Sequence, residues 1–336
     1  MRLILLANRR LWIVFVAMIG VVAVGCTAGS VSFTEPMSET LQVQGPVALV
    51  FKYPENVPVR YAFRFSMSTT GAERSNEVSR GVIHIINEGA FGDEFNRLRI
   101  RRQETERKRV EKTRVGETID SSIRDIYPQL SPNIIRQDPA DPRFTFPVDF
   151  YGRFAVRNET PFHFLFYDSL AHFLPAMSRK DAAVGEEWSA YVPVILGFKY
   201  MSNEFAIKAS HKIEQVVQLS NGHKAARIVF TMAGRFDTGE DPYATRFTDA
   251  FRSGQHVVNT VQGSGAALFD MDLGLVIWKS LSFRVTEERS YEKVTKLSEN
   301  TDKKVTQNVW QTDKSVYDVK ESWRYVAPDE AVPVSG

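Results

Sequence analysis

Apolar and polar residues alternate with a period of two along much of this chain. From Val59 to Met67 every odd position is apolar and most even positions are polar, which is typical of a strand with one buried face. Further runs that indicate strands lie at 82–86, 98–100, 205–217, 225–232, 277–285 and 317–325. In the last run the odd-numbered residues are apolar except for Glu321. Turn sequences such as Thr70-Gly71 and Asp270–Gly274 adjoin these runs, so the pattern predicts antiparallel sheets with one face toward water.

Helical periodicity is confined to two short segments. In Tyr167–Met177 the apolar residues recur at spacings of three and four, and Asp168 or Ser169 is a suitable N-cap. Thr245–Ser253 shows a weaker form of the pattern. We therefore predict a mainly β body, formed by an antiparallel curved sheet or an open half-barrel, with one or two short helices against the concave face.

Two segments depart from the alternation. Arg101–Arg114 carries so many charges that it suits either a solvated helix with ion pairs one turn apart or the polar tips of a hairpin. Its acidic residues interleave with the basic ones, which favours a solvated face over a patch for anionic lipid or a partner. Pro128–Pro147 contains five prolines and predicts an extended crossing, the candidate boundary between two halves of the body.

The first 25 residues have the organisation of an export signal. The basic residues Arg2, Arg9 and Arg10 precede a continuous apolar run from Leu11 to Val24. A membrane-spanning helix needs about 20 apolar residues, so this run is short for a permanent anchor. The alternatives are a short transmembrane anchor or an ordinary cleaved signal.

Cys26 is the only cysteine of the chain and directly follows Val24-Gly25. This segment resembles the lipobox of bacterial lipoproteins, in which the cysteine thiol is diacylated before cleavage; Ala23 stands where the family prefers leucine. The resemblance implies cleavage before Cys26 and anchoring in a membrane through the lipid, since two or more acyl chains give stable attachment. Thr27, rather than aspartate, follows the cysteine, which by the logic of that family implies the outer membrane if the cell has one.

These features predict the organisation of the chain. We expect a signal peptide at 1–25, a lipidated flexible tether at 26–45, a β-rich body at 46–326 and a flexible tail at 327–336. A lipidated Cys26 leaves no thiol for a disulfide, a nucleophile or a metal site. Three of the 42 basic residues lie in the leader, so the rest carries 39 Lys and Arg against 40 Asp and Glu. A net charge of −1 on an exported protein gives no indication of nucleic-acid binding.

Motifs for metal, cofactor or covalent chemistry are weak. The six histidines include no pair spaced for a zinc hydrolase. Asp270-x-Asp272-x-Gly274 partly matches a calcium loop, but a hairpin turn with a left-handed glycine explains it better. Gln262-Gly263-Ser264-Gly265 is neither a nucleophile elbow nor a dinucleotide loop. We therefore expect no metal, no cofactor and no enzymatic activity.

Aromatic residues are concentrated between 144 and 173. The stretch has two readings: an ordinary core, or the lining of an apolar cavity or a docking surface for a partner or acyl chain. The ten residues are Phe144, Phe146, Phe150, Tyr151, Phe154, Phe162, Phe164, Phe166, Tyr167 and Phe173.

Two motifs of the body resemble exported bacterial β-sheet proteins of unknown function. They are Val184-Gly185-Glu186-Glu187-Trp188 and the segment from Gly263 to Asp270 that is followed by Gly274. The resemblance covers 175–291 and implies long antiparallel strands, without catalytic residues. Trp188 and Phe269 are expected to begin strands that pack inward.

Together these observations favour a non-enzymatic envelope lipoprotein that acts through protein partners. The alternative is a carrier or sensor of an apolar ligand, such as an acyl chain, held in a β half-barrel. A hydrolase of envelope polymers comes last, because the chain lacks catalytic motifs.

Overall fold

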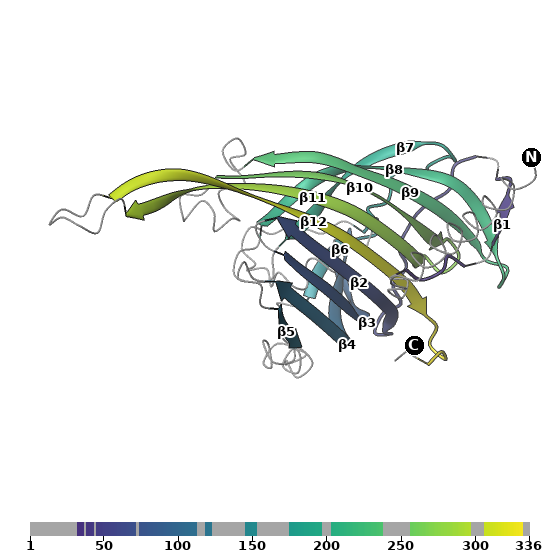
Figure 1. The fold of residues 1–336 in the computed structure, drawn as a ribbon. Coiled ribbons are helices and arrows are strands. Elements are labelled where there is room, and N and C mark those ends of the chain that lie inside the picture. The colour runs from purple at the N-terminus through teal and green to yellow at the C-terminus, as the bar shows by residue number, and fades with distance from the viewer. Residues whose placement is uncertain are drawn as a thin grey trace, which may run out of the picture. The chain divides into compact units, whose positions relative to one another are not determined.

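Strands make up the regular structure of the part of the chain that the structure describes (Figure 1). A computed structural model describes residues 32–36, 38–43, 45–71, 74–112, 118–122, 145–152, 175–196, 203–237, 256–296 and 306–331, which belong to one compact unit, Ser32–Gly336. The strands are β1 Ser38–Leu41, β2 Val59–Gly71, β3 Arg74–Phe91, β4 Phe95–Lys112, β5 Thr118–Ser122, β6 Thr145–Asp149, β7 Glu187–Leu196, β8 Asn203–Leu219, β9 Lys224–Asp237, β10 His256–Asp270, β11 Leu275–Lys296 and β12 Thr306–Val326.

All of these strands join one open, curved, antiparallel sheet. Its order is β1-β8-β9-β10-β11-β12-β2-β3-β4-β5, so most neighbours in the sheet are also neighbours in sequence. At one edge, β7 and β1 pair with successive parts of β8; at the other, β6 and β5 pair with successive parts of β4. The predicted fold class, a mainly β curved antiparallel sheet, is confirmed.

The alternation of side chains is the reason for this sheet. In β2 the odd residues Val59, Tyr61 and Phe63 are buried on one face, which we call the inner face. Residues directly opposite in neighbouring strands share a face, so Trp323 of β12, paired with Phe63, is also on the inner face. Each predicted strand run falls within a strand of the sheet, although the strands extend beyond the runs.

The described residues contain no helix, and accordingly none long and apolar enough to span a membrane. The predicted helix Thr245–Ser253 lies outside them, as does most of Tyr167–Met177. Residues 175–177 are described and are not helical. Pro175 cannot donate a backbone hydrogen bond, and the backbone N–H of Met177 donates to the carbonyl of Tyr151 at 2.8 Å.

The described part of the charged segment is a strand, whereas most of the proline-rich segment, 128–144, lies outside the described residues. The described part of Arg101–Arg114 is the end of β4, which forms a hairpin with β5, so the hairpin alternative is observed and the helix is not. Pro147, the last of the five prolines, lies in β6. Among the described strands, this short strand pairs with β4 alone, which suits a residue that has no backbone donor.

The predicted tether is not wholly detached from the sheet. Its residues Ser38–Leu41 form β1, because the edge of β8 offers unpaired backbone groups. Phe33 lies on the opposite, outer face: its carbonyl accepts a hydrogen bond from the Trp278 indole at 2.9 Å, and Arg64 stacks on its ring at 4.5 Å. The start of the predicted tail is also attached, since Arg60 donates to the carbonyls of residues 327, 328 and 330.

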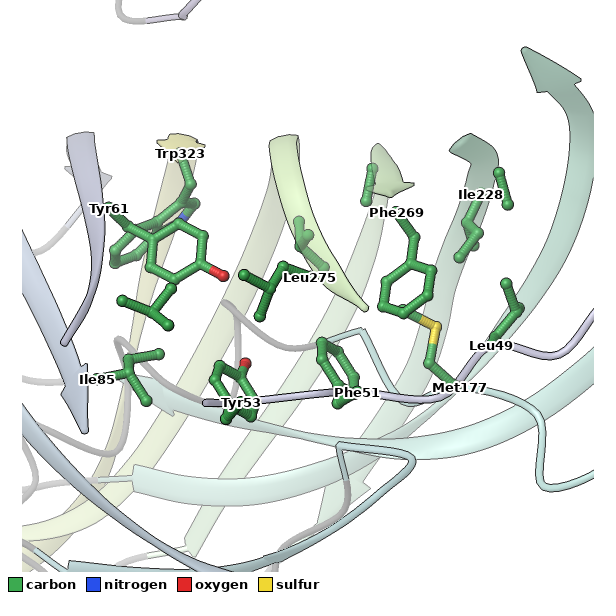
Figure 2. Close-up of a cluster of buried hydrophobic side chains, with 14 of the residues drawn as sticks. Leu49, Phe51, Tyr53, Tyr61, Ile85, Met177, Ile228, Phe269, Leu275 and Trp323 are labelled. Atoms are coloured by element: carbon green, nitrogen blue, oxygen red, sulfur yellow. The ribbon is translucent and has the colours of Figure 1, made fainter. Parts of the chain in front are cut away.

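A crossing segment, residues 47–56, covers part of the inner face (Figure 2). Its alternate residues Leu49, Phe51 and Tyr53 are buried, and Figure 2 shows them facing the side chains of the strands. Backbone hydrogen bonds hold the segment to four places, at residues 87, 150, 182 and 274. We call the apolar core beneath it the covered cluster; it includes Tyr61, Phe63, Ile228, Phe269, Leu275 and Trp323.

Candidate functional site

A row of rings crosses the inner face on three neighbouring strands. Trp188 of β7 stacks on His211 of β8, with ring centres 5.7 Å apart and planes 13° apart. His211 in turn contacts Phe230 of β9, at 5.6 Å and 32°. His211 is opposite Trp188 and Phe230 in the strand register, so the sheet itself aligns the three rings. Trp188 also donates from its indole to the carbonyl of Ala176 at 2.8 Å, which fixes the end of the row.

Glycine makes room for the row to continue across β10. Gly265 stands opposite Phe230, and a Cβ at this position would lie 2.4 Å from Cζ of that ring. A Cβ at Gly263 would lie 2.4 Å from Cβ of Phe283 on β11. The Gly-x-Gly motif therefore lets aromatic side chains lie over the backbone of β10, as expected for glycines at a close approach.

The row ends at a buried lysine on β11. Lys279 is paired with Ala267 on one side and Trp323 on the other, both members of the covered cluster, so it belongs to the inner face. It is only 2% exposed, and its ammonium lies 5.8 Å from the centre of the Phe230 ring. Burial lowers the pKa of Lys279 to about 8, and the negative charge of Glu321 opposes that shift.

Next to this lysine begins a second apolar cluster. We call it the strand cluster, because in the described part of the chain all its members come from the strands of the sheet. Its buried members are Met67, Ala209, Phe230, Met232, Val261, Leu281, Phe283, Val285 and Val319. The covered cluster differs in having Leu49, Phe51 and Tyr53 of the crossing segment packed against it.

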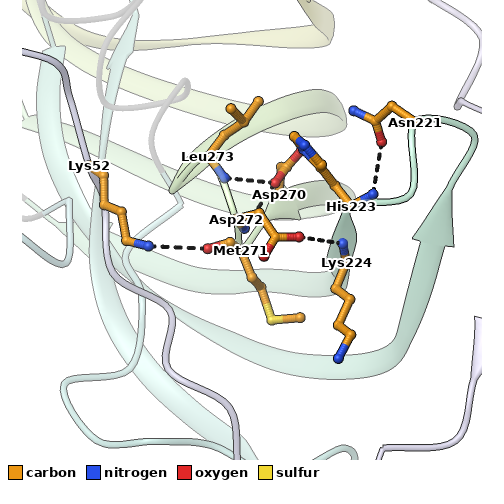
Figure 3. Close-up of polar contacts among 8 residues, drawn as sticks. All are labelled: Lys52, Asn221, His223, Lys224, Asp270, Met271, Asp272 and Leu273. Atoms are coloured by element: carbon orange, nitrogen blue, oxygen red, sulfur yellow. Dashed lines mark hydrogen bonds and ion pairs between the residues drawn. The ribbon is translucent and has the colours of Figure 1, made fainter.

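A polar junction connects two hairpins at one end of the sheet (Figure 3). The carboxylate of Asp270 accepts hydrogen bonds from the backbone of Asp272 and Leu273 at 3.0 and 2.9 Å, and lies 2.8 Å from Nδ1 of His223. Asp272 accepts from the backbone of Lys224 at 2.8 Å. The hydrogen bond to Asp270 and that residue's charge raise the pKa of His223.

This junction has a structural explanation. His223, Asp270 and Asp272 have ligand types that suit a metal, with ligand atoms within 4.8 Å of one another. However, the oxygens of Asp270 already accept two hydrogen bonds from the backbone of their own turn and one from His223, which joins the β10–β11 turn to the β8–β9 turn. Gly274 has a φ of 68°, so the hairpin turn predicted at 270–274 is confirmed.

The residues predicted from the sequence as an aromatic site are only partly described. Phe146 lies in β6, Tyr151 packs on the covered cluster, and Phe150 is 38% exposed. Phe150 and Tyr151 thus differ in burial, and the predicted lining stays a prediction. Outside the described residues are Cys26, Phe144, Phe154, Phe162, Phe164, Phe166, Tyr167 and Phe173.

Sequence reasoning missed the row of rings and its lysine. Trp188 was expected to begin a strand that packs inward, and it is the second residue of β7. Phe269 packs inward too, but lies near the end of β10 rather than at its start. The sequence did contain one sign of this charged pair. Glu321 and Lys279 each occupy a position at which the alternation of their own strand predicts an apolar residue. The pairing of β11 with β12 brings these together, and a single sequence does not show that pairing.

Comparison with known proteins does not assign this chain to a family. No family model matches the chain, and no curated protein matches it. Among solved structures, one on lipid–protein interactions in lipovitellin matches with a TM-score of 0.38 and 9% identity. The match covers 84% of this chain but 26% of that chain, so the chain spans about a quarter of its length. At this level the likeness carries no functional argument, because similar sheets serve unrelated functions.

Proposed function

We propose that this protein is a lipid-anchored envelope protein that binds an apolar ligand on the inner face of its sheet, as a carrier or sensor and without catalysis. The main observation in support of this proposal is the contrast between the two apolar clusters. The crossing segment closes the covered cluster, whereas the strand cluster consists of side chains from the sheet alone within the described residues.

An apolar sheet face requires a cover, because each large apolar side chain removed from water contributes about 1.5–3 kcal/mol. Phe283 and Val319 of the strand cluster are 5% and 3% exposed, so this face is screened from water, although in the described ranges the apolar residues packed there come from the sheet alone. In this proposal an acyl chain packs along these side chains, and aromatic residues of 144–173 contribute to the lining. The anchor at Cys26 would keep the carrier beside the membrane that supplies such chains.

The proposal is tested on the full chain purified from membranes in a mild non-ionic detergent. Native mass spectrometry should show extra mass that extracts into organic solvent, beyond the anchor attached to Cys26. Val319→Thr replaces a methyl group of the strand cluster by a hydroxyl at nearly constant shape and should lower occupancy. Val316→Thr, on the outer side of the same strand, is the matched control. A protein that carries no extractable amphiphile and takes up no added one contradicts the proposal.

A second candidate function, docking of a protein partner, is favoured by the far end of the β11–β12 hairpin. In the part of the chain that the structure describes, β11 pairs beyond Ser290 with β12 alone, and the two strands run past their neighbours (Figure 1). Trp310 and Val309 on this extension are 60% and 46% exposed. Exposed tryptophan is enriched among residues that anchor interfaces. A photocrosslinker at Trp310 should capture one envelope protein, and the same crosslinker at the exposed Thr260 of β10 should not.

A further inference from the structure

Lys279 stands at the boundary between the two clusters. Its strand neighbours Ala267 and Trp323 belong to the covered cluster, and Leu281, two residues along β11, belongs to the strand cluster. The ammonium is therefore placed at the closed end of the strand cluster. A ligand that lay along this cluster would have one end beside a positive charge.

The N–H groups of this ammonium are also available as hydrogen-bond donors. A lysine carries three N–H donors, and burying them without acceptors is unfavourable. In the described ranges, Lys279 Nζ makes a cation–π contact with Phe230 and an electrostatic interaction with Glu321, but no hydrogen bond or close ion pair. Glu321 lies opposite Leu281, two residues from Trp323 along β12. Its negative charge therefore acts on the ammonium of Lys279 without a direct ion pair.

We infer that Lys279 binds the carboxylate of a long-chain fatty acid whose alkyl chain lies along the strand cluster. The inference rests on the proposed function and names its ligand class. The carboxylate would accept hydrogen bonds from the ammonium, and the rings of Phe230 and Phe283 would contact the first part of the chain. The single buried lysine supplies one positive charge, which suits a carboxylate, and Glu321 offsets part of that charge. A phosphate head of higher charge is typically held by several cations or by the fork of an arginine.

The test uses the purified full chain and three photoreactive probes with the same alkyl chain: palmitic acid, hexadecanol and hexadecyl phosphate, each carrying a diazirine. Labelled peptides are mapped, so that signal from the strands is separated from the lipidated N-terminus. Lys279→Met removes the charge at similar length. Lys320→Met, at an exposed position of β12, is the matched control. Glu321→Gln removes the nearby competing charge.

Wild type and Lys320→Met should label with the acid roughly tenfold better than with the alcohol, because charged hydrogen bonds are the stronger kind. Lys279→Met should lose this preference while it still labels with the alcohol, and Glu321→Gln should strengthen it. Thermal unfolding checks that each variant is folded; if Lys279→Met is not, the result for Glu321→Gln decides.

The alternative outcomes separate the two proposals. Equal labelling of wild type by acid and alcohol overturns the role of Lys279 and leaves the apolar-ligand function standing. Preference for the phosphate overturns the carboxylate head. Failure of every probe to label the strands overturns the proposed function itself.

Discussion

The ammonium of Lys279 lies 5.8 Å from the centre of the Phe230 ring, although β10 separates their strands. The contact is possible because Gly265 has no side chain between them. This arrangement connects a sequence motif, Gly-x-Gly, to the placement of a buried charge on the inner face.

Gly265→Ala tests this relationship. The new Cβ would lie 2.4 Å from the Phe230 ring and 2.5 Å from the carbonyl oxygen of Ser280, which is backbone and cannot turn away. We expect a loss of about 1–3 kcal/mol in unfolding free energy, as for other overpacked sites. Ser264→Ala, at the exposed position between the glycines, should stay within about 0.5 kcal/mol. Denaturant titration measures both; equal stability of the two variants would show that Phe230 moves aside without cost.

Phe51→Ala tests the crossing segment. Phe51 stacks on Tyr53 at 5.6 Å and meets Phe269 edge-on at 5.3 Å. Removing this buried ring should cost about 3–5 kcal/mol and loosen the segment. Val57→Ala, at a site 48% exposed, is the control and should change little. Hydrogen exchange should show faster exchange at residues 47–56 in Phe51→Ala alone; unchanged protection there would argue against the segment as the cover of the core.

The His223–Asp270 contact predicts a dependence of stability on pH. The pKa of His223 is raised above its ordinary value of 6.5, first by the hydrogen bond to Asp270 and then by that residue's charge. The stabilisation is therefore fully present below pH 6.5 and is lost as the pH rises through the raised pKa. His223→Gln retains a donor but does not titrate. The melting temperature of wild type should exceed that of the variant more in acid than in base, and a constant difference would contradict this.

Phe33→Ala should release the N-terminal segment from the outer face. The ring loses its cation–π contacts with Arg64 and Arg324, at 4.5 and 5.9 Å. Each such contact contributes about 0.5–1 kcal/mol at an exposed site, so the effect is local. Limited proteolysis within 32–43 should accelerate, with the core melting unchanged. The exposed Glu39→Ala serves as the control, and equal cleavage of both variants would remove Phe33 as the attachment point.

Cys26→Ser tests the predicted anchor. The lipobox resemblance requires the thiol, so the variant should remain uncleaved at this site and should incorporate no labelled palmitate. Gel mobility and metabolic labelling measure both properties. A variant that still matures and still carries the label would show that Cys26 is not the lipidated residue.

Much of the sheet was predictable, and much of the site was not. The strand of Val59–Met67 and the turn at Asp270–Gly274 follow from local preferences, since side chains alternate in a strand and a left-handed glycine closes a hairpin. The same alternation marked Glu321 as an exception within its strand. Nothing local showed that its neighbour across the sheet would be the strand of Lys279, because strand pairing depends on contacts between residues distant in sequence.

The sequence by itself determined the strand-rich character of the body, its antiparallel connections and the expectation of a lipid-anchored N-terminus. These properties depend on short periodic patterns and on one cysteine in its local context. Only the tertiary structure decided that the crossing segment covers one apolar cluster, that Phe33 attaches to the outer face, and that Lys279 is buried at the end of a row of rings. The reason is physical: burial and charge pairing belong to the assembled sheet, in which every residue acquires neighbours that its own strand does not specify.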